Sequence, residues 1–184
     1  MAGAMSNLDD LLKQASAAQQ APVERWNPPY CGDIGLSIAR DGTWFYQGSP
    51  IGRQPMVKLF ARVLRRDEDG RHYLVTPVEK VDVAVADAPF LAVEMEATGE
   101  GSKQSLTFRT NVDDVVRCGP RHPLRFELQA DGGIKPYLLV RGRLEALLTR
   151  SRYLDLVDLA QHQREGDVER FGVWSDGVFF ALPA

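Results

Sequence analysis

The sequence is poor in cysteine, in net positive charge and in long apolar segments. Its 184 residues include two cysteines, Cys31 and Cys118, which are too few for a disulfide scaffold and typical of reduced thiols. The net charge of −3 offers no overall positive field to recruit nucleic acid or anionic lipid. No apolar run approaches the roughly 20 residues of a membrane span. We therefore expect a cytoplasmic protein without a membrane or duplex nucleic-acid partner.

The N-terminal segment also lacks the features of a secretion signal, because Asp9 and Asp10 stand where such a signal is hydrophobic. Apolar residues nevertheless recur there at helical spacing, which predicts a short helix from Ser6 to about Ala18, followed by a linker over 19–22. A short isolated helix is marginal in water. We therefore expect residues 1–25 to form a leader that is peripheral to the core.

Two Asp-Gly pairs, Asp41-Gly42 and Asp176-Gly177, lie between β-type runs. This pattern predicts two-residue hairpin turns with a positive φ at each glycine. In the first hairpin, the predicted register sets Ile38 opposite Phe45 and places Trp44 on the other face of the sheet.

Apolar residues at helical spacing predict further helices over Gln54–Arg66 and Thr149–Gln163. Elsewhere, apolar and polar residues alternate with the period of strands, and short turns separate the runs. In the last hairpin, the predicted register sets Trp174 opposite Phe179. Together these patterns predict an α+β fold of mostly antiparallel strands.

The two halves of the chain share a weak repeat. A shift of 34 residues lays Thr76–Val81 on Thr110–Val115. We interpret the repeat as duplication of a small αβ unit, with halves at 26–98 and 99–184, although chance similarity explains it equally well. Duplicated units create a cleft between the copies, where ligands commonly bind.

Most catalytic motifs are absent from the sequence, including the phosphate-binding loop, the dinucleotide fingerprint and the nucleophile elbow. No histidine has a partner at metal-ligand spacing. We therefore expect no metal and no cofactor, and we assign no catalytic residue. If the chain is an enzyme, the acid or base is Glu79, Asp113 or Asp114.

Arginines near aromatic rings suit a small charged ligand, because the guanidinium pairs with anions and the ring stacks on a planar group. If the halves pack with two-fold symmetry, the polar residues around Thr76 and Thr110 meet near the axis. The same residues are equally suited to capping turns. The candidate ligand-binding residues are Trp44, Arg53, Thr76, Glu79, Lys80, Thr110, Asn111, Asp113, Arg141 and Trp174.

Several long motifs between about Trp26 and Ala184 resemble the sequence motifs of a known protein family. They are Cys31–Ile34, Ile38–Ile51, Leu74–Val81, Arg109–Asp113, Val140–Gly142 and Gly172–Phe180. In these segments the chain resembles the uncharacterised bacterial family called domain of unknown function 1285. The resemblance implies a duplicated α+β core, a C-terminal half similar to pleckstrin-homology-like folds, and a pocket between the halves. It assigns no activity and no catalytic residue.

The leading hypothesis is a cytoplasmic, non-enzymatic ligand-binding or regulatory protein. Its ligand is a small, nucleotide-like molecule that is held between the two halves and acts in signal transduction. One alternative is a small hydrolase or transferase that uses the carboxylates named above. The other is a protein-interaction module that binds a protein partner.

Overall fold

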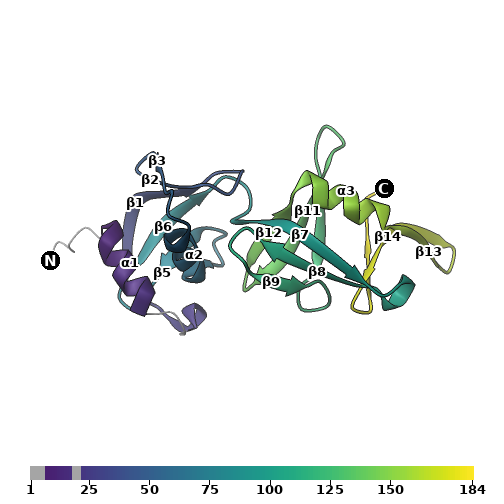
Figure 1. Cartoon of the computed structure of the whole chain (residues 1–184), viewed down its shortest axis with the longest axis horizontal. Coiled ribbons are helices and arrows are strands. Elements are labelled where there is room, and N and C mark those ends of the chain that lie inside the picture. Colours follow the sequence, from purple (N-terminus) through teal and green to yellow (C-terminus); the bar gives the residue numbers. More distant parts are fainter. Residues whose placement is uncertain (1–6, 18–21) are drawn as a thin grey trace. The chain divides into compact units, whose positions relative to one another are not determined.

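A computed structural model describes residues 7–17 and 22–184 (Figure 1). The contacts within the chain divide it into two compact units. Unit 1 is Met1–Pro89 with Gly142–Leu144, and unit 2 is Phe90–Arg141 with Glu145–Ala184. This division comes earlier in the chain than the boundary expected between residues 98 and 99, because the strand Phe90–Thr98 pairs with strands of unit 2.

Unit 1 is an antiparallel sheet of six strands with one parallel pair, β1 and β6, at its centre. The strand order is β3-β2-β1-β6-β5-β4, and α2 lies between β3 and β4 in the chain (Figure 1). Its elements are α1 (Leu8–Ala17), the 3-10 helix η1 (Val23–Arg25), β1 (Tyr30–Ile38), β2 (Trp44–Tyr46), β3 (Ser49–Pro50), α2 (Gln54–Arg62), β4 (Leu64–Arg66), β5 (His72–Val75) and β6 (Lys80–Val85).

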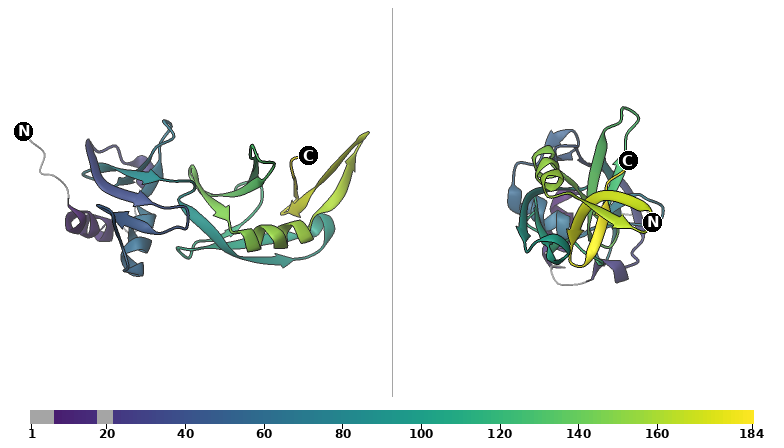
Figure 2. Two further views of the ribbon diagram at one scale, coloured as in Figure 1. Left: turned by 90° about the horizontal axis from the view of Figure 1, so that it is seen from above. Right: turned by 90° about the vertical axis from the view of Figure 1, so that its right-hand side faces the viewer.

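Unit 2 has a second six-stranded sheet, in the order β10-β11-β12-β7-β8-β9, and a three-stranded sheet, β13-β14-β15. Helix α3 lies along β7, as both views show (Figures 1 and 2). Its elements are β7 (Phe90–Thr98), the 3-10 helix η2 (Gly101–Lys103), β8 (Ser105–Thr110), β9 (Val115–Arg117), β10 (Leu124–Leu128), β11 (Ile134–Arg141), β12 (Leu144–Leu148), α3 (Arg150–Asp158), β13 (Gln161–Glu165), β14 (Val168–Ser175) and β15 (Val178–Ala181). The prediction of an α+β fold is therefore confirmed.

The two six-stranded sheets have the same strand order. Counted along the chain, each runs third, second, first, sixth, fifth, fourth, with the first and sixth strands parallel. The 34-residue shift does not follow this correspondence. It lays the β5–β6 turn on the β8–β9 turn, whereas the strand order matches β5–β6 with β11–β12.

The predicted register of the first hairpin is wrong by one residue. Ile38 pairs with Trp44 instead of Phe45, because the turn holds three residues between the paired Ala39 and Thr43. Gly42 has the predicted positive φ of 85°, but Asp41 does not share it. A turn followed by a single left-handed glycine adds one residue to the loop and moves every later side chain to the opposite face.

The second Asp-Gly hairpin has the predicted register. Asp176 and Gly177 have φ values of 49° and 80°, as a two-residue type I′ turn requires. Trp174 therefore pairs with Phe179, as expected.

The helices predicted over Gln54–Arg66 and Thr149–Gln163 both form, but each ends earlier than predicted. α2 ends at Arg62, and Leu64–Arg66 pairs with β5 instead. α3 ends at Asp158, and Gln161–Glu165 pairs with β14. In both segments, hydrogen bonds to a neighbouring strand outweigh a helical pattern of apolar residues, which is a weak local preference.

Helix α1 is not peripheral, so that expectation is wrong. Asn7 caps its N-terminus by accepting a hydrogen bond from the Asp10 amide at 2.8 Å. Leu11 and Ala15 are each only 1% exposed, and the helix packs against α2. Ser6 and most of the expected linker lie outside the described residues.

Candidate binding site

A polar cavity of about 430 Å³ opens on unit 1. Its walls come from η1 and the residues after it, from the end of β4 and the next turn, and from the Gly142–Leu144 turn of the same unit. Charged side chains of both signs dominate the lining, together with one indole ring. The lining residues are Glu24, Arg25, Trp26, Asn27, Arg65, Asp67, Glu68, Asp69 and Arg143.

Arg65 organises the floor of this cavity. Its guanidinium donates to the main-chain oxygens of Val23 at 2.9 Å and Trp26 at 2.7 Å. It also forms a two-point contact with the Asp67 carboxylate, at 2.6 and 3.2 Å. Only 7% of Arg65 is exposed. One buried cation therefore ties the segment before β1 to the end of β4.

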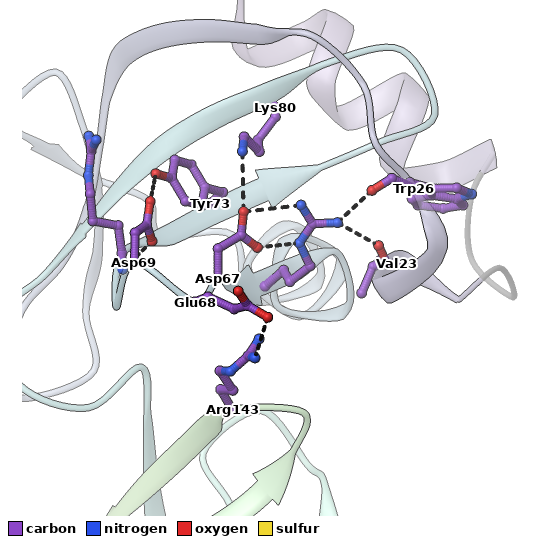
Figure 3. Close-up of polar contacts among 10 residues, drawn as sticks. Val23, Trp26, Asp67, Glu68, Asp69, Tyr73, Lys80 and Arg143 are labelled. Carbon is purple, nitrogen blue, oxygen red and sulfur yellow. Dashed lines mark hydrogen bonds and ion pairs between the residues drawn. The ribbon is translucent and has the colours of Figure 1, made fainter.

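Asp67 lies between two cations. Lys80 Nζ approaches its carboxylate at 3.2 Å, on the side away from the Val23 and Trp26 carbonyls (Figure 3). Burial alone would raise the pKa of Asp67, but the hydrogen bonds and charges of Arg65 and Lys80 hold that pKa below its ordinary value. Asp67 is therefore a fixed anion at neutral pH.

A second polar row continues across β5 and β6. The Tyr73 hydroxyl donates to Asp69 at 2.6 Å, and Lys80 Nζ lies 4.4 Å from the centre of the Tyr73 ring. The hydrogen bond to Asp69 raises the pKa of Tyr73 to about 12 and lowers the pKa of Asp69. Beside them, Asp82 accepts hydrogen bonds from Tyr30 and Arg71.

The sequence accounts for these positions locally. Arg65 and Asp67 are two residues apart along an extended segment, so their side chains share one face. Gly70, with φ of 81°, closes the turn back to β5 through a hydrogen bond to the Asp67 oxygen. On the opposite wall, Pro28 and Pro29 keep the segment after Trp26 extended.

Three side chains that line the cavity, those of Glu24, Arg25 and Trp26, are available to contact a ligand. Within the described part of the chain, the side chains of Glu24 and Arg25 form no hydrogen bond or ion pair, and the Trp26 ring is half-buried beside them. Glu68 meets Arg143 at 3.4 Å, but both side chains are at least half exposed, so this contact is weak. The cavity thus combines an ordered floor with an unpaired anion, an unpaired cation and a ring.

The ionisable groups of the floor are not tuned for proton transfer at neutral pH. Asp67 and Asp69 have lowered pKa values, and Tyr73 has a raised one. A general acid or base works best when its pKa lies near the working pH. This arrangement therefore favours binding over acid–base catalysis.

The structure places the predicted residues of unit 1 in several environments. Lys80 contacts the Asp67 carboxylate, which lines the polar cavity, but Lys80 itself is not one of the lining residues. Trp44 is 1% exposed and stacks on Phe60 in the core, so neither face of its ring is open. Arg53 is exposed at the N-terminus of α2.

Thr76 and Glu79 lie in the β5–β6 turn beneath α1. The Thr76 hydroxyl accepts from the Glu79 amide at 3.2 Å and donates to Gln14 at 2.6 Å. Glu79 is 5% exposed, and within the described residues its Oε1 atom has no hydrogen-bond partner. Burial raises the pKa of Glu79, but no described cavity reaches its carboxyl group.

The predicted residues of unit 2 mostly support turns. Thr110 is fully buried, and its hydroxyl accepts from the Asp114 amide at 3.1 Å, much as Thr76 does in its own turn. Asn111 accepts from the Leu91 amide at 3.0 Å, and Asp113 pairs with Arg109 at 2.8 Å. These contacts agree with the capping alternative.

Two other residues of unit 2 also have partners. Arg141 pairs with Asp114 at 2.7 Å and lies over the Phe90 ring. The Trp174 ring packs against Phe179, with 5.3 Å between ring centres. None of the unit 2 candidates lines the polar cavity of unit 1.

Comparisons with known proteins agree with the architecture. Residues 21–88 match the family model described as "Domain of unknown function (DUF1285), N-terminal domain", and residues 89–182 match that of the C-terminal domain. The chain belongs to the DUF1285 family. The two matched domains meet within one residue of the boundary between Pro89 and Phe90, although the turn Gly142–Leu144 of unit 1 lies in the second match. No curated protein matches the chain.

Two solved structures of DUF1285 proteins resemble it. A protein from Silicibacter pomeroyi DSS-3 is 48% identical, with a TM-score of 0.88 over 97% of this chain and 96% of its own. A protein from Shewanella baltica OS155 is 30% identical, with a TM-score of 0.53 over 68% of this chain and 91% of its own.

Sequence reasoning missed most of the cavity in this DUF1285 chain. The run Asp67-Glu68-Asp69 reads as a solvated loop, yet Asp67 is paired and Asp69 accepts two hydrogen bonds. One signal was available, namely an arginine two residues before an aspartate at the end of an apolar segment. Nothing in the sequence indicated that Val23 and Trp26 would supply the remaining acceptors.

Two further findings concern the described residues only. No group of three or more His, Cys, Asp or Glu side chains in them is placed to hold a metal ion. None of the helices in 7–17 and 22–184 is long and apolar enough to cross a membrane.

Proposed function

We propose that this DUF1285 protein is a cytoplasmic, non-enzymatic binding protein with a regulatory role, and that its ligand occupies the polar cavity of unit 1. The observation that carries the proposal is the floor built by buried Arg65. It holds Asp67, Val23 and Trp26 in place, and beside it the side chains of Glu24 and Arg25 make no hydrogen bond or ion pair with any residue that the structure describes. A preordered wall lowers the entropy cost of binding.

The ligand is a small nucleotide-like molecule with a planar ring and a single anionic group. The ring stacks on Trp26, the anion pairs with Arg25, and Glu24 accepts from an amino or hydroxyl group. A polyphosphate fits poorly, because four carboxylates line the cavity, those of Glu24, Asp67, Glu68 and Asp69. The volume of about 430 Å³ lies in the range of small-molecule sites.

Calorimetric titration with a panel of nucleoside monophosphates, nucleoside triphosphates and free amino acids tests the proposal. We expect saturable binding of a monophosphate that weakens about tenfold or more in Arg25→Gln and Trp26→Leu. Arg164→Gln, a change on the β13–β14 hairpin of unit 2, is the matched control and keeps wild-type affinity. Equal affinity of all four proteins for the bound compound would place its site elsewhere.

We further propose that the two units arose by duplication of one sheet. Their shared strand order supports this, although the segments aligned by the 34-residue shift do not correspond. The pleckstrin-homology-like character of the C-terminal half is part of the same proposal. It is supported by a mostly antiparallel six-stranded sheet that is followed along the chain by a helix, α3.

A further inference from the structure

A second cavity, of about 510 Å³, lies between α1 and α2 and shares no residue with the polar cavity. Most of its lining is apolar. The described residues that line it are Leu12, Ser16, Arg53, Pro55, Met56 and Leu59, and we call it the α1/α2 groove.

The two walls of the groove are held by contacts on their other sides. On α1, Leu11 and Ala15 are buried, and Gln14 accepts from the Thr76 hydroxyl at 2.6 Å. On α2, Val57 and Phe60 are buried in the core of unit 1. The neighbouring positions Leu12, Met56 and Leu59 therefore face the groove and stay partly exposed.

The polar groups of the groove are unequal. Ser16 donates its hydroxyl to the Leu12 oxygen at 2.8 Å, so that proton is occupied. Arg53 is the charged residue of the described lining, and its side chain makes no ion pair or hydrogen bond with any residue in 7–17 or 22–184. An apolar cavity with one cation at its edge complements an apolar molecule that carries one anion.

We propose that the α1/α2 groove binds a single-chain amphiphile with a carboxylate head, taken from free solution. The planar guanidinium of Arg53 pairs with the carboxylate, and a flexible hydrocarbon chain packs along Leu12, Met56 and Leu59. Methionine suits such a wall because its unbranched side chain adapts to the shape of its neighbour. This proposal does not depend on the polar cavity.

Isothermal titration of the full-length protein with decanoate, kept below its micelle concentration, tests the proposal. We expect saturable binding with one site per chain. Arg53→Gln should weaken it about tenfold or more, whereas Arg53→Lys should retain more affinity than Arg53→Gln. The control is Arg40→Gln, which removes another exposed arginine of unit 1 and should bind decanoate as wild type does.

Three results would overturn the proposal. The first is no saturable decanoate binding to the wild type, and the second is equal affinity in wild type and Arg53→Gln. The third is equal binding of decylamine, which has the same chain but a cationic head. An anionic amphiphile could also be presented by a lipid bilayer, and sedimentation with phosphatidylglycerol vesicles distinguishes this source from free solution. If the protein sediments with the vesicles but does not bind decanoate, the groove binds a membrane surface and the proposal is wrong. None of these results bears on nucleotide binding at Arg25 and Trp26.

Discussion

Arg65 shows how one side chain can connect two segments that are distant in sequence. It neutralises Asp67 and satisfies two main-chain oxygens, and a lysine can direct fewer donors to such a set. The buried pair need not make the fold more stable than an apolar pair would. Its consequence is an ordered cavity floor, and removing either partner leaves charges or carbonyls unpaired.

Replacing Arg65 with alanine should lower the free energy of unfolding by about 3 kcal/mol, because the partly buried Asp67 carboxylate loses its main partner and the Val23 and Trp26 oxygens lose their donor. Urea denaturation measures the change. Arg66→Ala is the matched control, since Arg66 makes one exposed hydrogen bond to Gly70, and it should cost about 1 kcal/mol or less. Equal losses in the two variants would contradict the role assigned to Arg65.

The same pair predicts an acid-sensitive contribution. The folded pKa of Asp67 is lowered, so its contribution to stability is present above the unfolded pKa of about 3.9 and is lost as the pH falls through the folded value. The difference in unfolding free energy between wild type and Arg65→Ala should therefore shrink below about pH 4. A difference that stays constant from pH 7 to pH 3 would rule out this linkage.

Glu79 predicts the opposite dependence. Burial raises its pKa, so the ionised form destabilises the fold, and that cost grows as the pH rises above the unfolded value of about 4.3. Glu79→Gln should be more stable than wild type at pH 8, and its advantage should fade towards pH 4. Glu96→Gln, a change at an exposed strand position, should show no such gain in denaturation curves over this range.

At the scale of single elements, α1 shows how a helix that is weak alone becomes part of a core. Its ten residues are too few for a stable isolated helix. Burial of Leu11 and Ala15 and the Gln14–Thr76 hydrogen bond supply the missing stability. α1 also forms one wall of the α1/α2 groove, so its docking and ligand binding there should be linked.

Leu11→Ala should lower the free energy of unfolding by about 3 kcal/mol, as expected for a leucine truncated in a packed core. Lys13→Ala, an exposed change on the same helix, should stay within about 0.5 kcal/mol of wild type. Chemical denaturation followed by circular dichroism compares the two. A Leu11→Ala protein as stable as Lys13→Ala would mean that α1 does not dock in solution.

The type I′ turn at Gly177 gives a prediction about a turn. Gly177→Ala should destabilise the protein by about 1 kcal/mol, because its φ of 80° is strained for any residue with a Cβ atom. Gly52→Ala is the control, since Gly52 has an ordinary φ and open space around its Cβ position. Thermal melting of both variants distinguishes backbone strain from simple loss of glycine.

At the scale of the whole molecule, each unit has a core of its own. Phe60 and Leu74 are fully buried in unit 1, and Phe108 and Leu138 are fully buried in unit 2. Leu11→Ala should therefore speed amide exchange in β5 and β6 more than in β8, and Phe108→Ala should do the reverse. Hydrogen exchange read by mass spectrometry tests this, and equal acceleration in both units would mean a single cooperative unit.

Local chemistry allowed part of this protein to be read from its sequence. The Asp176-Gly177 turn, its register, the existence of the three α-helices in the described residues and the α+β class follow from turn residues and apolar periodicity, which act over a few neighbouring residues. The long motifs were enough to recognise the family. These features depend on short-range preferences that are strong and specific.

Tertiary structure alone decided the rest. Leu64–Arg66 and Gln161–Glu165 are strands because partner strands were available, and Trp44 is in the core because one extra turn residue changed its face. The polar cavity joins Val23 and Trp26 to Arg65, about forty residues away in the chain. Such contacts depend on which surfaces meet after the chain has folded. The spacing of residues along the chain does not predict which distant segments will come into contact.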